Sequence, residues 1–156
     1  YRAQYGLDVA VLTPLPVPAE AADPQRQQVD AATLMSNVIA AFPEAYADPE
    51  AVFIGVTPLD LYDSTSHFRY VFGIKGDFLD PIGIVSTFRM NPEFYGSPAD
   101  PDLTLSRFRK LLTKYVGMLY YGLPTSDDPA SPMFNKILEP DDLDAMGEPL
   151  PLLETQ

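Results

Sequence analysis

Proline sets the strongest limit on what this chain can fold into, since 17 of its 156 residues are proline, roughly double the usual share. A proline cannot continue a strand ladder, and it interrupts a helix. We therefore expect few regular elements, joined by long and stiff connections. The hydrophobic share of 46%, with 12% aromatic residues, is enough for one core and excludes a disordered chain. We expect a single domain over residues 1–156, with a flexible tail over residues 148–156.

The charge balance excludes most nucleic-acid-binding proteins. Asp and Glu number 22 and Lys and Arg 10, so the formal charge is −12, whereas binding to phosphates needs a basic stripe. The same balance argues against an anionic membrane surface as partner. No apolar run approaches the ~18 residues that span a bilayer, so we expect no membrane insertion. The densest basic stretch is typical of one solvated helix face: Arg107, Arg109, Lys110 and Lys114.

The chain contains no cysteine. Disulfides, a thiol nucleophile and cysteine-ligated metals are therefore excluded, and the redox compartment cannot be inferred. The numbering opens at Tyr1 rather than Met, and residues 1–5 read like the end of a longer segment. We expect that an upstream segment has been removed, as in an exported and processed protein; the compartment and the oligomeric state stay open.

Apolar patterning predicts the secondary structure. We expect strands over Leu7–Leu12, Ala51–Thr57, Arg69–Lys75 and Ile82–Phe88. We expect two main helices and one short one, over Asp30–Ala41, Asp102–Tyr121 and Asp141–Met146. The short separation of the last two strands favours an antiparallel hairpin. This order predicts an α+β fold: a twisted mixed sheet of about four strands, two main helices and an irregular C-terminal region.

Three collinear stretches resemble the archaemetzincin family of zinc-dependent metallopeptidases. They are Pro14–Met35, Val52–Tyr62 and Phe72–Gly96. In that family a segment V-S-x-x-R-L-x-P-E-F-Y-G leads into the helix that bears the zinc motif. Its positions are occupied here, in order, by Val85, Ser86, Arg89, Pro92, Glu93, Phe94, Tyr95 and Gly96. The resemblance covers roughly Leu7 to Asn135 and implies a zincin-like fold.

The zinc motif itself is lost. A zincin needs two histidines at i and i+4 on one helix, with a Glu beside the first as general base. In the register fixed by Gly117, the family's H-E-x-x-H falls on Lys114, Tyr115, Val116, Gly117 and Met118, and its third zinc-binding His falls on Pro124. The cysteines of the family's second, structural zinc are absent as well. We therefore expect no catalytic residue, no metal ligand and no cofactor.

Two interpretations of the altered positions stay open. The Lys114 ammonium either occupies the electrostatic position of the lost cation or is solvated, with Met118 as core filler. The tyrosines around the helix, Tyr115, Tyr120 and Tyr121, either line a peptide-binding groove or fill the volume left by zinc and its ligands. Met133 falls where the family has its Met-containing turn, which places it beneath the altered site.

Other chemistry has weaker support. Hydroxyls and carboxylates cluster near the single histidine, His67, but no G-x-S-x-G elbow is present; this cluster is Asp60, Asp63, Ser64 and Ser66. The late acidic residues do not fit a calcium-loop spacing and are explained by helix capping and solvation: Asp127, Asp128, Glu139, Asp141, Asp142 and Asp144. For His67 we expect a surface or cap role.

The leading functional interpretation is a catalytically inactive peptidase homologue that binds a peptide or protein. Zincins of this kind bind extended peptide against an edge strand, which we assign to Ile82–Phe88, over a groove of Tyr115, Met118, Tyr121 and Ser86, with Lys114 on its floor. One alternative is an active zinc peptidase with ligands from elsewhere, such as His67 with Asp127 or Asp128, or from a partner chain. Another is a purely structural accessory domain with an acidic, solubilising surface and no cleft.

Overall fold

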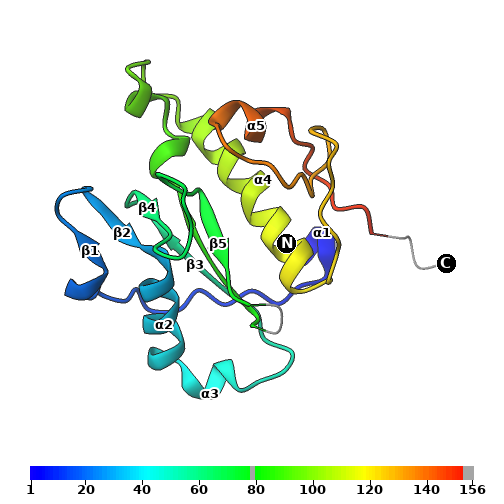
Figure 1. Ribbon diagram of the computed structural model, residues 1–156. Helices are drawn as coiled ribbons and strands as arrows, with labels where there is room; N and C mark the ends of the chain where they lie inside the picture. The colour runs from blue at the N-terminus through cyan, green and yellow to red at the C-terminus, as the bar shows by residue number, and fades with distance from the viewer. Residues whose placement is uncertain (78–79, 153–156) are drawn as a thin grey trace.

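Two three-stranded sheets form the β part of the protein (Figure 1). The computed structural model describes residues 1–77 and 80–152. The first sheet has the order β1-β2-β4, with bounds Ala22–Asp23, Gln28–Asp30 and Leu61–Tyr62. The second has the order β3-β6-β5, with bounds Phe53–Thr57, Ile82–Ser86 and Gly73–Lys75. An isolated antiparallel bridge links Leu61 of β4 to Val71, just before β5. The expected sheet of about four strands is thus divided in two.

Five α-helices and three short 3₁₀ helices accompany these sheets in the described residues. The α-helices are α1 (Arg2–Tyr5), α2 (Ala31–Ala41), α3 (Pro43–Tyr46), α4 (Pro101–Leu119) and α5 (Pro140–Ala145). The 3₁₀ helices are η1 (Ala19–Ala21), η2 (Phe88–Met90) and η3 (Pro92–Tyr95). None of the helices in the described part is long and apolar enough to cross a membrane.

Strand β6 is the centre of the second sheet. It pairs in parallel with β3 on one side and antiparallel with β5 on the other. Helices α2 and α4 cover its two faces, because Ile84 packs in the cluster of Leu34 and Val85 in the cluster of Leu111 (Figure 1). The antiparallel hairpin is confirmed, but the assignment of Ile82–Phe88 as the edge strand is wrong, since both sides of β6 are paired.

Capping residues begin both main helices where the sequence predicts. The Asp30 carboxylate accepts the Thr33 N–H at 3.2 Å at the start of α2, which ends before Pro43. The Asp100 carboxylate accepts the Leu103 N–H at 2.9 Å at the start of α4. The sequence therefore predicts both helices to within two residues.

The short helix α5 also forms, with a different cap from the expected Asp141. Glu139 and Asp142 bond to each other at its start, because the Asp142 carboxylate accepts the Glu139 N–H at 3.0 Å and the Glu139 carbonyl accepts the Asp142 N–H at 3.1 Å. This satisfies otherwise unpaired N–H groups of the first turn.

The strand predicted over Leu7–Leu12 does not form. Residues 7–18 contain no helix or strand, and Val11 is 96% exposed. The β-branched, apolar run suits a buried strand, but a strand also needs a partner edge, and the prolines that follow lack the N–H donors for a ladder.

Residues 148–150, near the C-terminus of the chain, pack against α4. Glu148 forms an ion pair with Arg109 at 2.6 Å, and Leu150 is buried beside Val116 and Met133. The first part of the expected tail thus contacts the helix. Residues 153–156, the rest of that expectation, lie outside the described residues.

Candidate functional site

The zinc-motif positions lie on the C-terminal half of α4, which packs against the second sheet. Tyr115, at the position of the family's general-base Glu, is buried in the core. A Cβ atom added to Gly83 would lie 2.5 Å from its ring, and one added to Gly73 would lie 2.8 Å from its hydroxyl oxygen. Two glycines on neighbouring strands thus form the cradle for this ring.

Burial also determines the chemistry of Tyr115. Removal from water disfavours the phenolate, so burial raises the pKa of this hydroxyl above its ordinary value. A tyrosine that stays protonated at neutral pH cannot serve as the general base that a Glu supplies. Tyr115 therefore fills volume between α4 and the sheet.

Lys114, at the position of the first histidine ligand, is 7% exposed. The interpretation that it is solvated is wrong, and so is the single solvated face of four basic residues, because Arg107 is buried too. Burial lowers the pKa of Lys114 from 10.5 to about 8. No hydrogen bond or ion pair in the described part of the chain involves its ammonium group.

The other altered positions are more accessible. Met118 is partly buried and packs against two hydrophobic clusters, while Pro124 is exposed after the end of α4. The Tyr121 hydroxyl donates to the carbonyl oxygen of Tyr5 at 3.1 Å. This hydrogen bond holds the turn after α4 against the N-terminal segment.

Ser86 does not contribute to an open surface. It is 2% exposed, and its hydroxyl donates to the carbonyl oxygen of Leu59 at 2.6 Å while accepting the Phe88 N–H at 3.1 Å. Of the four residues predicted to line a groove, Tyr115 and Ser86 are therefore inside the protein. Met118 and Tyr121 keep partial exposure.

Met133 lies under α4 at the level of the altered motif. Its sulfur would be 2.7 Å from a Cβ atom added to Gly117, so the thioether packs directly on the helix backbone. The Ser131 hydroxyl accepts the Met133 N–H at 3.1 Å and fixes the turn that carries it. Met133 thus packs against α4 beside Gly117.

The residues at these positions do not fit a zinc ion. An ammonium, a buried phenol and a proline offer no ligand, and one thioether is a poor ligand for zinc. Within residues 1–77 and 80–152, no three His, Cys, Asp or Glu side chains come together to hold a metal ion. His67, Asp127 and Asp128 are among these residues and form no such group. Asp127 instead contacts Asn135 and Lys136.

A second polar centre, which the zinc motif did not predict as a site, links the loop after β3 to β2 and η2. Asp60 is buried and accepts two hydrogen bonds from Arg89, both at 2.7 Å, and one from the Gln28 amide at 3.0 Å. The Arg89 guanidinium also lies over the rings of Tyr70 and Phe94, at 3.9 and 4.6 Å from the centroids. The signal in the sequence was the Arg of the V-S-x-x-R segment.

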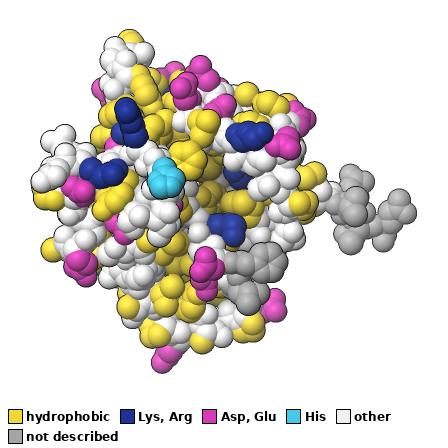
Figure 2. All heavy atoms as spheres, viewed as in Figure 1, with side chains coloured by type: hydrophobic (Ala, Val, Ile, Leu, Met, Phe, Trp, Pro, Cys, Tyr) yellow, Lys and Arg dark blue, Asp and Glu magenta, His cyan; other side chains and the backbone are white. Residues whose placement is uncertain are grey.

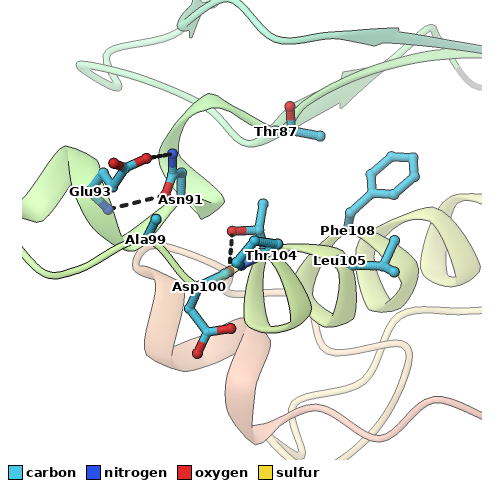
Figure 3. A pocket seen from close by; sticks show the side chains of 9 residues that line it. Thr87, Asn91, Glu93, Ala99, Asp100, Thr104, Leu105 and Phe108 are labelled. Carbon is cyan, nitrogen blue, oxygen red and sulfur yellow. Dashed lines mark hydrogen bonds between the residues drawn. The ribbon is translucent and has the colours of Figure 1, made fainter.

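One pocket lies away from the altered motif. It has a volume of about 370 Å³ at the start of α4, and Asn91, Thr104 and Phe108 are among its lining residues (Figure 3). In Figure 3 the Asn91 and Glu93 side chains bond to each other, and Thr104 bonds to the backbone of Asp100. None of the altered zinc positions lines it, so we do not assign the family's chemistry to this pocket.

Sequence comparison finds archaemetzincins. The chain is 31% identical to the archaemetzincin of Pyrococcus furiosus over 146 residues, which cover 90% of this chain and 72% of that protein. It is 34% identical to the archaemetzincin of Thermococcus kodakarensis over 67 residues, which cover 43% of this chain and 34% of that protein. No family model matches the chain.

Solved structures agree with the sequence relatives. A zinc-dependent peptidase from Methanocorpusculum labreanum superposes with a TM-score of 0.73 at 25% identity, covering 96% of this chain and 84% of that one. An archaemetzincin from Archaeoglobus fulgidus, solved with malonate, superposes with a TM-score of 0.68 at 21% identity, over 93% of this chain and 78% of that one, and supports the fold alone. Sequence and fold together show that this chain belongs to the archaemetzincin family.

Proposed function

We propose that this chain is a non-hydrolytic archaemetzincin-family domain that binds an extended peptide along the outer edge of β5. The observation that carries the first half is the set of side chains at the zinc-motif positions. Lys114 is an ammonium where zinc needs a neutral imidazole, and Tyr115 is a buried, protonated phenol where hydrolysis needs a carboxylate base. Water activation by zinc has no support from such a residue set.

The second half is supported by the pairing of β5. The Phe72 carbonyl accepts the Ser86 N–H and the Gly76 N–H donates to Ile82, both at 2.8 Å, so even-numbered residues bond to β6. In an antiparallel pair the residues between them, Gly73 and Lys75, direct their N–H and C=O groups away from β6. An extended peptide can add to these groups as a further strand.

Metal content tests the loss of zinc. Protein purified with zinc in the medium and then dialysed should contain none above the level of a non-binding control protein, by plasma mass spectrometry. The triple variant Lys114→His, Met118→His and Pro124→His restores the three ligands and keeps Tyr115 in its cradle. Zinc retention by the variant alone supports loss of the ligands as the cause; near-stoichiometric zinc in the wild-type protein would overturn the proposal.

Peptide binding is tested by selection from a displayed random-peptide library, followed by calorimetry with the selected peptides. Lys75→Pro removes both the lysine side chain and the outward N–H of residue 75. Lys75→Ala removes the lysine side chain but keeps this N–H. We expect Lys75→Pro to weaken binding about tenfold, as loss of one or more main-chain hydrogen bonds implies, and Lys75→Ala to change it about twofold or less. Selection of no peptide, or equal effects of the two variants, would contradict binding at β5.

A further inference from the structure

Two basic side chains on α4 are buried to the same extent, but only one has a carboxylate partner. Arg107 is 6% exposed and Lys114 is 7% exposed. They are seven residues apart, so they lie two turns from each other on the same side of the helix. Arg107 bonds to both oxygens of Asp144, at 2.8 and 2.6 Å, and to the carbonyl of Met90 at 2.9 Å. Lys114 has no corresponding partner among the described residues.

The Lys114 side chain is mostly buried, but its ammonium nitrogen is not completely enclosed, because no fully buried side-chain nitrogen or oxygen of the described residues lacks a hydrogen-bond partner. Partial removal of this charge from water is still costly to the folded protein. Burying a charge without a hydrogen-bonded counter-charge carries a desolvation penalty. A shorter or neutral side chain at position 114 would not carry this penalty. Tyr115 next to it is neutral, and desolvation is the only cause of the lowered Lys114 pKa, without a contribution from a neighbouring carboxylate. Because that pKa is still about 8, most Lys114 side chains are protonated at neutral pH.

The surroundings favour an anion supplied from outside. On the face seen in Figure 2, hydrophobic side chains gather over α4 between β5 and α5, and Asp and Glu side chains lie mainly around the periphery. The chain as a whole carries a charge of −12, so cationic side chains, of which Figure 2 shows several on this face, are its minority charge.

We propose that the Lys114 ammonium binds a carboxylate of the peptide ligand, in place of a metal ion. The inference rests on the proposed function for the identity of the ligand as a peptide. A carboxylate matches an ammonium in charge, and a charge-assisted hydrogen bond in a water-poor site is stronger than one at the surface. The carboxylate comes from the C-terminus of the peptide or from an acidic side chain; the two sources share this chemistry.

Matched peptides distinguish the sources. The probes are one acetylated tetrapeptide of valine and threonine as the free acid, the same peptide as the C-terminal amide, and an amide with an internal glutamate. Calorimetry against the wild-type protein should show binding at least about tenfold tighter for one carboxylate peptide than for the plain amide. Lys114→Met should reduce this ratio to about twofold or less, and Lys114→Arg, which keeps the charge, should retain part of it.

A control variant removes charge without touching the site. Lys136 is 70% exposed and pairs with Asp127, so Lys136→Met should leave the preference unchanged. Circular dichroism and urea unfolding establish that each variant is folded. Equal affinity of wild-type protein for acid and amide peptides, or an unchanged preference in Lys114→Met, would overturn the inference.

A second measurement separates this inference from the proposed function. The backbone amide resonances of the α4 residues around Lys114 are followed by NMR, in wild-type protein and in Lys114→Met, during titration with acetate alone. A saturable shift that is lost in Lys114→Met supports the carboxylate site even if no peptide binds at β5. Binding of all three peptides with equal strength and with sensitivity to Lys75→Pro supports the proposed function and contradicts the carboxylate site.

Discussion

The aromatic ring of Tyr115 lies against the backbone of Gly83, at the point where α4 crosses the central strand of the second sheet. A Cβ atom on Gly83 would be 2.5 Å from one ring carbon and 2.6 Å from the next. The Tyr115 ring therefore fits the space that Gly83 leaves on β6. Tyr115 stands at the position where the family has its catalytic Glu. The match explains how the fold accommodates a large ring where hydrolysis requires a small, ionised group.

Gly83→Ala should lower the free energy of unfolding by about 1–3 kcal/mol, because the added methyl group overlaps the Tyr115 ring and an overpacked core must shift. Urea unfolding measures this. In a Tyr115→Leu background, where the ring is absent, the same substitution should cost clearly less, which gives a coupling energy in the double-mutant cycle. Equal costs in the two backgrounds would show that the ring is not what Gly83 accommodates.

The sequence predicts the helices and the hairpin well because their signals are local. Asp30 caps α2 and Asp100 caps α4 within a few residues of the apolar pattern that follows, and the turn between β5 and β6 is short. The prediction of a strand over residues 7–12 is wrong because strand formation is not a local property. Its pattern is local, but strand formation depends on a partner edge that a sequence pattern does not reveal.

Long-range pairing also explains the error about the edge strand. The run Ile82–Ser86 is buried throughout, which is typical of a strand covered on both faces. Only its hairpin partner β5 is close in sequence, so the local pattern predicts one neighbouring strand. The parallel neighbour β3 lies 25 residues or more earlier in the chain. At the candidate site, the loss of the zinc ligands could be predicted from residue identity, whereas burial of Lys114 depends on packing of distant segments.

The buried Lys114 should make stability depend on pH in the alkaline range. Its pKa is about 8 in the folded protein against 10.5 as the ordinary value, so between these pH values the unfolded chain binds more protons and the free energy of unfolding rises with pH. At about 1.4 kcal/mol per pKa unit the full effect is about 3 kcal/mol. Lys114→Met should be more stable than wild type at pH 7 by up to this amount.

The measurement is urea unfolding of both proteins at several pH values from 7 to 10. The stability difference between Lys114→Met and wild type should shrink as the pH rises through 8, because deprotonation removes the cost of the buried charge. Tyrosine ionisation affects both proteins alike. A difference that stays constant over this range would contradict a lowered Lys114 pKa. For the control Lys136→Met, the stability difference from wild type should not shrink with pH in this way.

The Asp60–Arg89 pair should contribute strongly to stability because it is largely removed from water. Asp60 is 7% exposed and Arg89 19%, and the pair joins the loop after β3 to η2. Asp60→Asn keeps the shape but leaves the guanidinium without its counter-charge, which should cost about 3 kcal/mol in urea unfolding. Asp8→Asn breaks an exposed ion pair with Arg2 and should cost under about 1 kcal/mol. Similar costs for the two variants would contradict the role of burial.

The Arg107–Asp144 pair holds α5 against α4 and offers a graded test of the same principle on one helix. Arg107→Leu leaves the Met90 carbonyl without its donor, while Asp144, at 36% exposed, regains water. We therefore expect a cost of about 2 kcal/mol, below that of a pair whose remaining partner stays buried. Arg109, two residues along α4, pairs with Glu148 at the surface, and Arg109→Leu should cost under about 1 kcal/mol. Hydrogen exchange should show faster opening of α5 in Arg107→Leu alone; equal protection of α5 in both variants would mean that this ion pair does not fix the helix.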